Sequence, residues 1–142
     1  MFKLNVRYIV KLLGMTHLLE SFFMLAATGV AFGYGGCDFY PLLISTGIMS
    51  GTGLLLYLIG RKGNDYRSGR REGMLSVSFM WTMFSFLGML PYLISGYIDN
   101  VTDAYFETMS GFTTTGATIL TDIEALPKGL LFWRSLTQWQ GG

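Results

Sequence analysis

The chain has 142 residues, of which 51% are hydrophobic and only 13% are charged. Soluble domains carry about 25% charged residues, so this composition argues against a soluble globular protein and favours a polytopic α-helical membrane protein. The net charge of +1 points to no class of partner, and the single cysteine, Cys37, excludes a disulfide bond within the chain.

The N-terminal part predicts an interfacial segment followed by a first membrane span. Residues 1–11 are basic and amphipathic, with Lys3, Arg7 and Lys11, and we expect them to lie at the membrane surface. Residues 12–32 are apolar over the length of a span, whereas the hydrophobic part of a cleaved signal peptide is shorter. The sequence therefore favours a membrane helix over a signal peptide.

Two ionisable residues lie inside this first span. His17 and Glu20 are three residues apart and share one face of a helix. We expect Glu20 to pack inward against a hydroxyl or backbone group of a neighbouring helix, with His17 beside it as a hydrogen-bond partner. A proton relay and a metal site are the alternatives, but a relay needs more titratable partners and a metal ion needs more ligands.

The second span and the loop after it set the expected orientation. Residues 42–60 are apolar, and Gly47 and Gly51 form a GxxxG match that predicts close helix contact. The loop 61–72 is the most basic part of the chain, but it lacks the interleaved aromatic residues of a nucleic-acid site. By the positive-inside rule, this loop and the N-terminus are cytoplasmic.

A third span and a short helix follow. Residues 74–97 have spanning length, and we expect Pro91 to bend this helix near its outer end. Residues 103–112 predict a helix that is too short to cross a bilayer at about 1.5 Å of rise per residue. We expect Thr102 to cap the N-terminus of this short helix.

Residues 113–118 read Thr-Thr-Thr-Gly-Ala-Thr and carry the main indication of function. Three consecutive β-branched residues followed by glycine disfavour a helix. At membrane depth, such backbone is tolerated only where protein buries it or where it lines a watery path. The C-terminal end of the preceding helix brings a partial negative charge, and loop carbonyls can replace the hydration shell of a monovalent cation. The pattern predicts a re-entrant pore helix followed by a selectivity-filter loop.

The order of these segments resembles the TrkH/KtrB potassium-transport family. The resemblance is carried by residues 103–118, which read Asp-Ala-Tyr-Phe-Glu-Thr-Met-Ser-Gly-Phe-Thr-Thr-Thr-Gly-Ala-Thr, and by residues 126–142. Members of this family have four units of span, pore helix and span around one pathway. The resemblance implies that Thr114 and Thr115 offer oxygen atoms that coordinate potassium. The implied filter segment as a whole consists of Thr113, Thr114, Thr115, Gly116 and Ala117.

By the same resemblance, the chain is an all-α membrane protein: transmembrane helices plus a re-entrant pore helix and a filter loop. Residues 1–72 are an N-terminal helix pair with a cytoplasmic basic loop, as in the TrkH branch. Residues 73–142 are a first, truncated pore unit, made of span 74–97, pore helix 103–112, filter 113–118 and an incomplete next span, 130–142. We expect Trp133 and Arg134 to anchor that last span at the outer interface, and a place in the permeation path is the alternative for Arg134.

The implied function is potassium uptake across the bacterial inner (plasma) membrane, with potassium as the transported ligand and no other cofactor. The resemblance also implies a homodimer of the full-length protein, a cytosolic nucleotide-binding regulatory subunit and contact with membrane lipid, but not with nucleic acid. The alternative is a small integral membrane scaffold or assembly protein with no ion pathway. An enzyme is not expected, because only His17 and Glu20 offer a candidate pair of catalytic groups.

Overall fold

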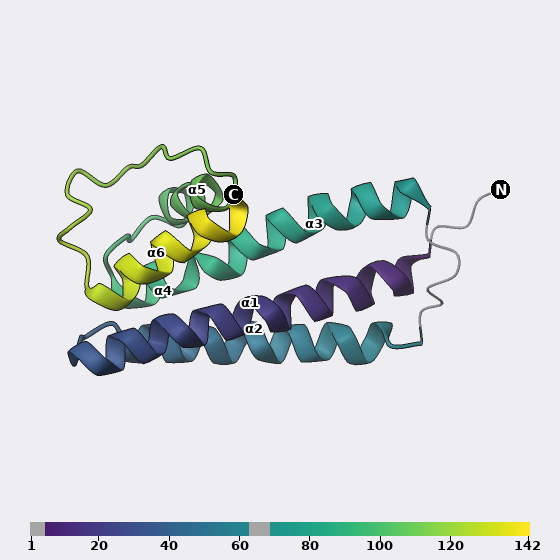
Figure 1. The fold of residues 1–142 in the computed structure, drawn as a ribbon, viewed down its shortest axis with the longest axis horizontal. Helices are drawn as coiled ribbons and strands as arrows, with labels where there is room; N and C mark the ends of the chain where they lie inside the picture. Colours follow the sequence, from purple (N-terminus) through teal and green to yellow (C-terminus); the bar gives the residue numbers. More distant parts are fainter. Residues whose placement is uncertain (1–4, 63–68) are drawn as a thin grey trace.

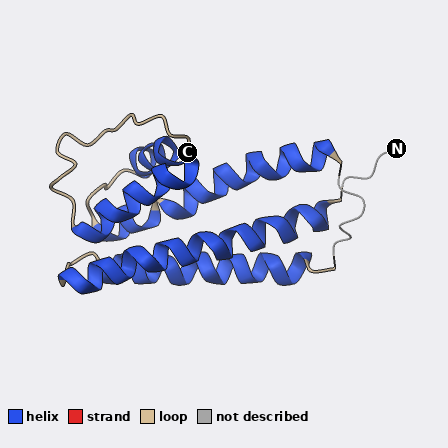
Figure 2. Cartoon of the chain, viewed as in Figure 1, coloured by secondary structure: helices blue, strands red, loops and turns tan. Residues whose placement is uncertain are grey.

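The computed structural model describes residues 5–62 and 69–142, and these residues form helices joined by turns and one long loop (Figures 1 and 2). The helices are, in chain order, α1 (Val6–Tyr34), α2 (Phe39–Gly60), α3 (Arg70–Gly88), α4 (Leu90–Ser95), α5 (Val101–Phe112) and α6 (Lys128–Gly141). The predicted all-α class is confirmed. Part of the predicted basic loop, and Lys3 in the N-terminal segment, lie outside the described residues.

α1 and α2 form an antiparallel hairpin that runs along one side of the molecule (Figure 1). α1 begins earlier than the apolar run, because the side chain of Asn5 accepts a hydrogen bond from the N–H of Tyr8 at 3.2 Å and caps the helix. It ends at Gly35, which has a left-handed φ of 62°. Glycine adopts this conformation without strain, so the chain can reverse directly into α2.

Glycine residues bring the two helices of the hairpin together, but not the glycines of the predicted motif. A Cβ atom added at Gly14 or at Gly60 would collide with the backbone of the facing helix. Gly47 and Gly51, by contrast, have open space where a Cβ would lie. The predicted contact through the GxxxG match is therefore wrong within this chain, although small residues do allow the close packing.

α3 and α4 follow one another with an interruption at Met89, and Pro91 lies in the first turn of α4. Proline has no N–H to donate and its ring crowds the preceding turn, which explains why the helix is interrupted here. The bend predicted at Pro91 agrees with this interruption. Within the described residues, Val6–Tyr34, Phe39–Gly60 and Arg70–Ser95 are long and apolar enough to cross a membrane.

Bulky apolar side chains cover the outward faces of these three spans. Apolar side chains that are at least 50% exposed include Leu19 and Phe22 on α1, Leu54 and Leu55 on α2, and Phe79 on α3. Such extended apolar surface is unfavourable in water but suits contact with lipid chains. The exposure pattern therefore supports the assignment of these helices to a membrane.

The core that positions the candidate site lies where α5 and α6 meet the end of α3. Trp133 on α6 is fully buried, and its ring centre lies 6.3 Å from that of Phe112 at an angle of 78°. The indole N–H of Trp133 donates a hydrogen bond to the carbonyl of Gly88 at 3.0 Å. α6 is thus held against both the end of the third span and the C-terminal end of α5.

Candidate functional site

The site begins with α5, the short helix that precedes the Thr-rich loop. Asn100 caps this helix, because its side chain accepts a hydrogen bond from the N–H of Thr102 at 3.0 Å. The prediction that Thr102 is the cap is wrong, since Thr102 already lies inside the first turn. Asp103 lies in the same turn, where its negative charge stabilises the positive end of the helix dipole.

The helix ends at Phe112 in a turn that forces a threonine into a left-handed conformation. The N–H of Thr114 donates to the carbonyl of Gly111 and the N–H of Thr115 donates to the carbonyl of Ser110, both at 3.0 Å. This pair of bonds normally has glycine at its centre, but here the central residue is Thr114, with φ of 54°. A β-branched residue in this region costs about 1–3 kcal/mol. Backbone strain of this kind is concentrated at functional sites.

The loop then turns again at Gly116, which has φ of 74° and open space around its missing side chain. Left-handed residues at positions 114 and 116 therefore flank Thr115, and no helix can continue through this segment. All six residues from 113 to 118 are exposed in this chain. The predicted filter loop is thus non-helical and has a surface that is open to another molecule or ion.

The hydroxyl groups of the loop are engaged within the protein, whereas three carbonyl groups are free. The side chain of Thr113 donates to the carbonyl of Met109 at 2.7 Å, and Ser110 donates to the carbonyl of Ala117 at 2.6 Å. Across the described residues, no hydrogen bond is formed to the carbonyl oxygens at positions 114, 115 and 116. Unpaired backbone carbonyls are the groups that coordinate dehydrated cations in ion pathways.

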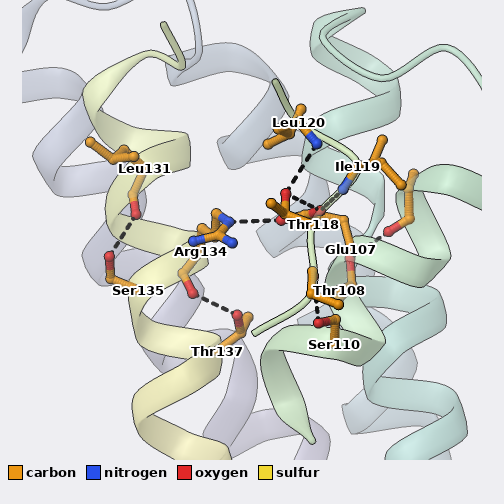
Figure 3. A network of polar contacts seen from close by, with 12 residues as sticks. Glu107, Thr108, Ser110, Thr118, Ile119, Leu120, Leu131, Arg134, Ser135 and Thr137 are labelled. Atoms are coloured by element: carbon orange, nitrogen blue, oxygen red, sulfur yellow. Dashed lines mark hydrogen bonds and ion pairs between the residues drawn. The ribbon is translucent and has the colours of Figure 1, made fainter. Parts of the chain in front are cut away.

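Glu107, in the middle of α5, holds the C-terminal end of the Thr-rich loop, at Thr118 and Ile119 (Figure 3). One carboxylate oxygen accepts hydrogen bonds from the hydroxyl of Thr118 at 2.8 Å and from the N–H of Ile119 at 3.2 Å. The other oxygen accepts from Nε of Arg134 on α6 at 2.7 Å. The side chains of Glu107 and Arg134 are only 1% and 13% exposed, so the ion pair is shielded from water. A single carboxylate thus connects α5, the loop and α6.

Comparison with known proteins identifies the family. Residues 46–142 match the family described as TrkH, cation transport protein. The chain belongs to the TrkH family. It is 33% identical over 141 residues to the Trk system potassium uptake protein TrkH of Halomonas elongata, covering 98% of this chain and 29% of that protein. The TrkH of Escherichia coli is 47% identical over 73 residues, which are 51% of this chain and 15% of that protein.

The fold of this chain also matches a solved structure of a TrkH protein. The crystal structure of the potassium transporter TrkH from Vibrio parahaemolyticus superimposes with a TM-score of 0.89 at 34% sequence identity. The match covers 97% of this chain and 30% of that structure. The chain therefore spans less than a third of the relatives that it matches over nearly its whole length. The resemblance predicted from residues 103–118 and 126–142 is confirmed.

The prediction that Trp133 and Arg134 anchor α6 at the membrane interface is wrong. We expected both to anchor α6 at the outer interface, but Trp133 is fully buried in the core and Arg134 pairs with Glu107. The hydropathy pattern alone could not show this, because it places residues in depth but does not identify their partners. One indication was present: Glu107 and Arg134 are opposite charges in two neighbouring apolar segments, and such charges are usually paired.

The inward packing predicted for Glu20 is confirmed. The hydrogen bond predicted between Glu20 and His17 is wrong, because Nδ1 of His17 bonds within α1 and its Nε2 has no partner among the described residues. His17 is fully buried, its Nδ1–H donates to the carbonyl of Leu13 at 2.7 Å, and its ring centre lies 5.0 Å from that of Phe84. Glu20 is also buried, and it faces the side chain of Gln140 at the end of α6. Both residues are remote in sequence from the Thr-rich loop, but Glu20 contacts a helix that the loop leads into.

Proposed function

We propose that the complete protein takes up potassium across the membrane and that residues 113–118 form one segment of its selectivity filter. The carbonyl oxygens of Thr114, Thr115 and Gly116 are the proposed ligands for the ion, with Thr113 and Ala117 completing the segment. The observation that carries this proposal is the run of three unpaired carbonyls at residues 114–116, of which the first and the last residue are left-handed. A dehydrated potassium ion is a natural occupant, because such oxygens replace its water shell.

Three further features support the proposal. The C-terminal end of α5 directs a partial negative charge of about half an electron toward the loop, which favours a cation there. Glu107 holds the far limb of the loop at Thr118 and Ile119, so the proposed filter is supported at both ends. Relatives that match nearly all of this chain are described as potassium uptake proteins of the Trk system.

The remaining family expectations belong to the same proposal. The protein resides in the bacterial inner membrane with its N-terminus and the loop 61–72 in the cytoplasm, as the distribution of Lys and Arg favours. The full-length protein is a homodimer that binds a cytosolic nucleotide-binding regulatory subunit. Potassium is its transported ligand, and it uses no other cofactor. It is a transporter and not an enzyme, in keeping with the transport function of its relatives.

The test is potassium-dependent growth of an uptake-deficient bacterium that expresses the full-length protein or its Gly116→Ser variant. We expect Gly116→Ser to lower uptake by about tenfold or more and to reduce the preference for potassium over sodium, because a side chain at φ of 74° is strained. Gly96→Ser is the matched control, since Gly96 also has φ of 74° and open space but lies outside the loop. If uptake and ion preference in Gly116→Ser equal those of the control at equal membrane levels, the loop is no filter and a scaffold role is favoured.

A further inference from the structure

The helix that follows the filter loop is held at its start by a residue from the N-terminal hairpin. α6 begins at Lys128 after Pro127, and proline offers no side-chain acceptor for the free N–H groups of the first turn. The N–H of Leu130 in that turn donates to Oδ2 of Asp38 at 2.9 Å. Asp38 lies 92 residues earlier, in the turn between α1 and α2, and is fully buried. A carboxylate of the hairpin therefore caps a helix of the pore unit.

The packing around this contact leaves no room for α6 to shift. A Cβ atom added at Gly129 would lie 2.6 Å from Cβ of Ala31 and 2.8 Å from Cδ1 of Leu42, and it would also collide with Oδ2 of Asp38. These distances are shorter than any ordinary carbon contact, so the glycine is required for the close approach. The first turn of α6 thus fits into a recess formed by both helices of the hairpin, with the carboxylate at its base.

The contact between Asp38 and Leu130 adds little net stability, because it buries a carboxylate. Oδ1 of Asp38 is buried and, among the described residues, has no hydrogen-bond partner. A buried carboxylate that is only partly paired is unfavourable, and apolar packing of similar volume is often more stable. The interaction with the positive end of the α6 dipole offsets part of this cost. A directional contact of this kind fixes the position and register of a helix, which apolar packing does less strictly.

The other end of α6 is held by the hairpin and reaches the proposed filter. With its amide nitrogen facing α1, Gln140 donates to both carboxylate oxygens of Glu20, at 2.9 Å and 3.2 Å. A Cβ atom added at the neighbouring Gly141 would collide with the carbonyl of Phe112, where α5 ends, and one added at Gly142 would lie 3.5 Å from the methyl carbon of Thr114. Any displacement of α6 along its axis is therefore transmitted to the residues from which the loop starts.

We propose that Asp38 is a positioning residue for the filter: by capping α6 from the hairpin, it sets where α6 supports the pore helix and the Thr-rich loop. This inference rests on the proposed function of residues 113–118. The hairpin thereby has a role in ion selection although it contributes no ligand to the ion. Arg134, midway along α6, binds Glu107, which in turn binds the loop at Thr118 and Ile119. The position of α6 therefore also affects this end of the loop.

The test compares Asp38→Ala and Asp38→Asn in the full-length protein, measuring uptake and the potassium-over-sodium preference per protein molecule in the membrane. Alanine removes the acceptor, and we expect the preference to fall by roughly tenfold, the size expected when a buried donor loses its partner. Asparagine keeps an acceptor but loses the charge, and we expect a fall of about threefold. Ser45→Ala is the control, because Ser45 is a buried polar residue of α2 whose hydroxyl donates to the carbonyl of Pro41 in its own helix.

The graded order of wild type, Asp38→Asn and Asp38→Ala is the signature of positioning, since a loss of folded protein alone would lower the amount in the membrane and leave the preference unchanged. If Asp38→Ala does not reach the membrane, Asp38→Asn decides. A wild-type ion preference in whichever of these variants is present in the membrane overturns the inference. Gly116→Ser, assayed in parallel, separates the two proposals: if it alters the preference while the Asp38 variants do not, only the positioning role is lost.

Discussion

The hairpin of α1 and α2 and the unit of α5, α6 and their loop are built in different ways. In the hairpin, most hydroxyl groups bond to carbonyls one turn back in their own helix, as Thr16, Ser45 and Thr52 do. The hydrogen bond between Thr28 and Thr46, at 3.2 Å, joins the two helices. The two helices of the hairpin come into close contact at glycines, which allow the backbones to approach.

The second unit depends on polar contacts between distant segments. Glu107 reaches the loop and α6, Trp133 reaches the end of α3, and Leu130 reaches the hairpin. Its helices are shorter than a membrane span, so packing along their length cannot fix them as it fixes α1 and α2. The hairpin is therefore held mainly by close helix packing, whereas the candidate site is held by buried charges with specific partners.

The largest effect is expected when Glu107 is removed from the second unit. Glu107→Ala deletes the contacts to Thr118, Ile119 and Arg134 and leaves a shielded guanidinium without its partner. We expect a loss of stability of about 3–5 kcal/mol, as for other broken buried ion pairs, and loss of most potassium uptake. Thermal unfolding in detergent and uptake per molecule are the measurements.

Glu124→Ala serves as the control for this variant, since Glu124 is an exposed carboxylate of the same loop. Equal melting temperatures for the two variants would contradict the assignment of Glu107 as the residue that holds the loop.

A smaller effect is expected when the hairpin is overpacked. Gly14→Ala places a methyl group against the backbone at Tyr57, and we expect a loss of about 1–3 kcal/mol in unfolding free energy. Gly47→Ala, where there is open space, should cause no loss. The ion preference of the folded protein should stay unchanged in both variants, because Gly14 packs against Gly53 and Tyr57 of α2 and Gly47 faces open space. A changed preference in Gly14→Ala would show that the two regions are less separate than the contacts indicate.

The smallest effect is expected at the polar contact within the hairpin. Thr28→Val keeps the shape of the side chain and removes its bond to Thr46 on α2, together with its bond to the carbonyl of Met24 in its own helix. Hydrogen bonds between membrane helices contribute about 0.6 kcal/mol on average, so the melting temperature should shift only slightly. A shift as large as that of Glu107→Ala would argue that polar contacts are as important in the scaffold as in the site.

The sequence predicted the spans well, because each one is an apolar run whose length is set by the bilayer. The ends of the helices were less accurate, since they depend on polar caps that hydropathy does not register. α3 begins at Arg70 rather than residue 74 because the carboxylate of Glu72 accepts a hydrogen bond from the N–H of Gly69 at 2.9 Å. The non-helical loop was predictable for a local reason: three threonines and a glycine disfavour a helix.

The supports of the loop were not predictable in the same way. In the sequence, Asp38 is an acidic residue of a glycine-rich segment, and Glu107 is one of several acidic residues between positions 99 and 124. Their roles depend on which segments meet in space, and a single sequence does not contain that information except as unpaired charge in apolar surroundings. The glycines that matter, such as Gly129, are likewise defined by the neighbours they meet and match no short motif.

The contact between Asp38 and Leu130 also has a consequence for biogenesis. The acceptor is synthesised 92 residues before the donor, so the hairpin can insert and fold while α6 has yet to leave the ribosome. When α6 is synthesised, the hairpin residues that surround Gly129 are already folded. The first turn of α6 can then pack directly against them. The hairpin then acts as an internal assembly guide for the segment of the chain that follows the Thr-rich loop.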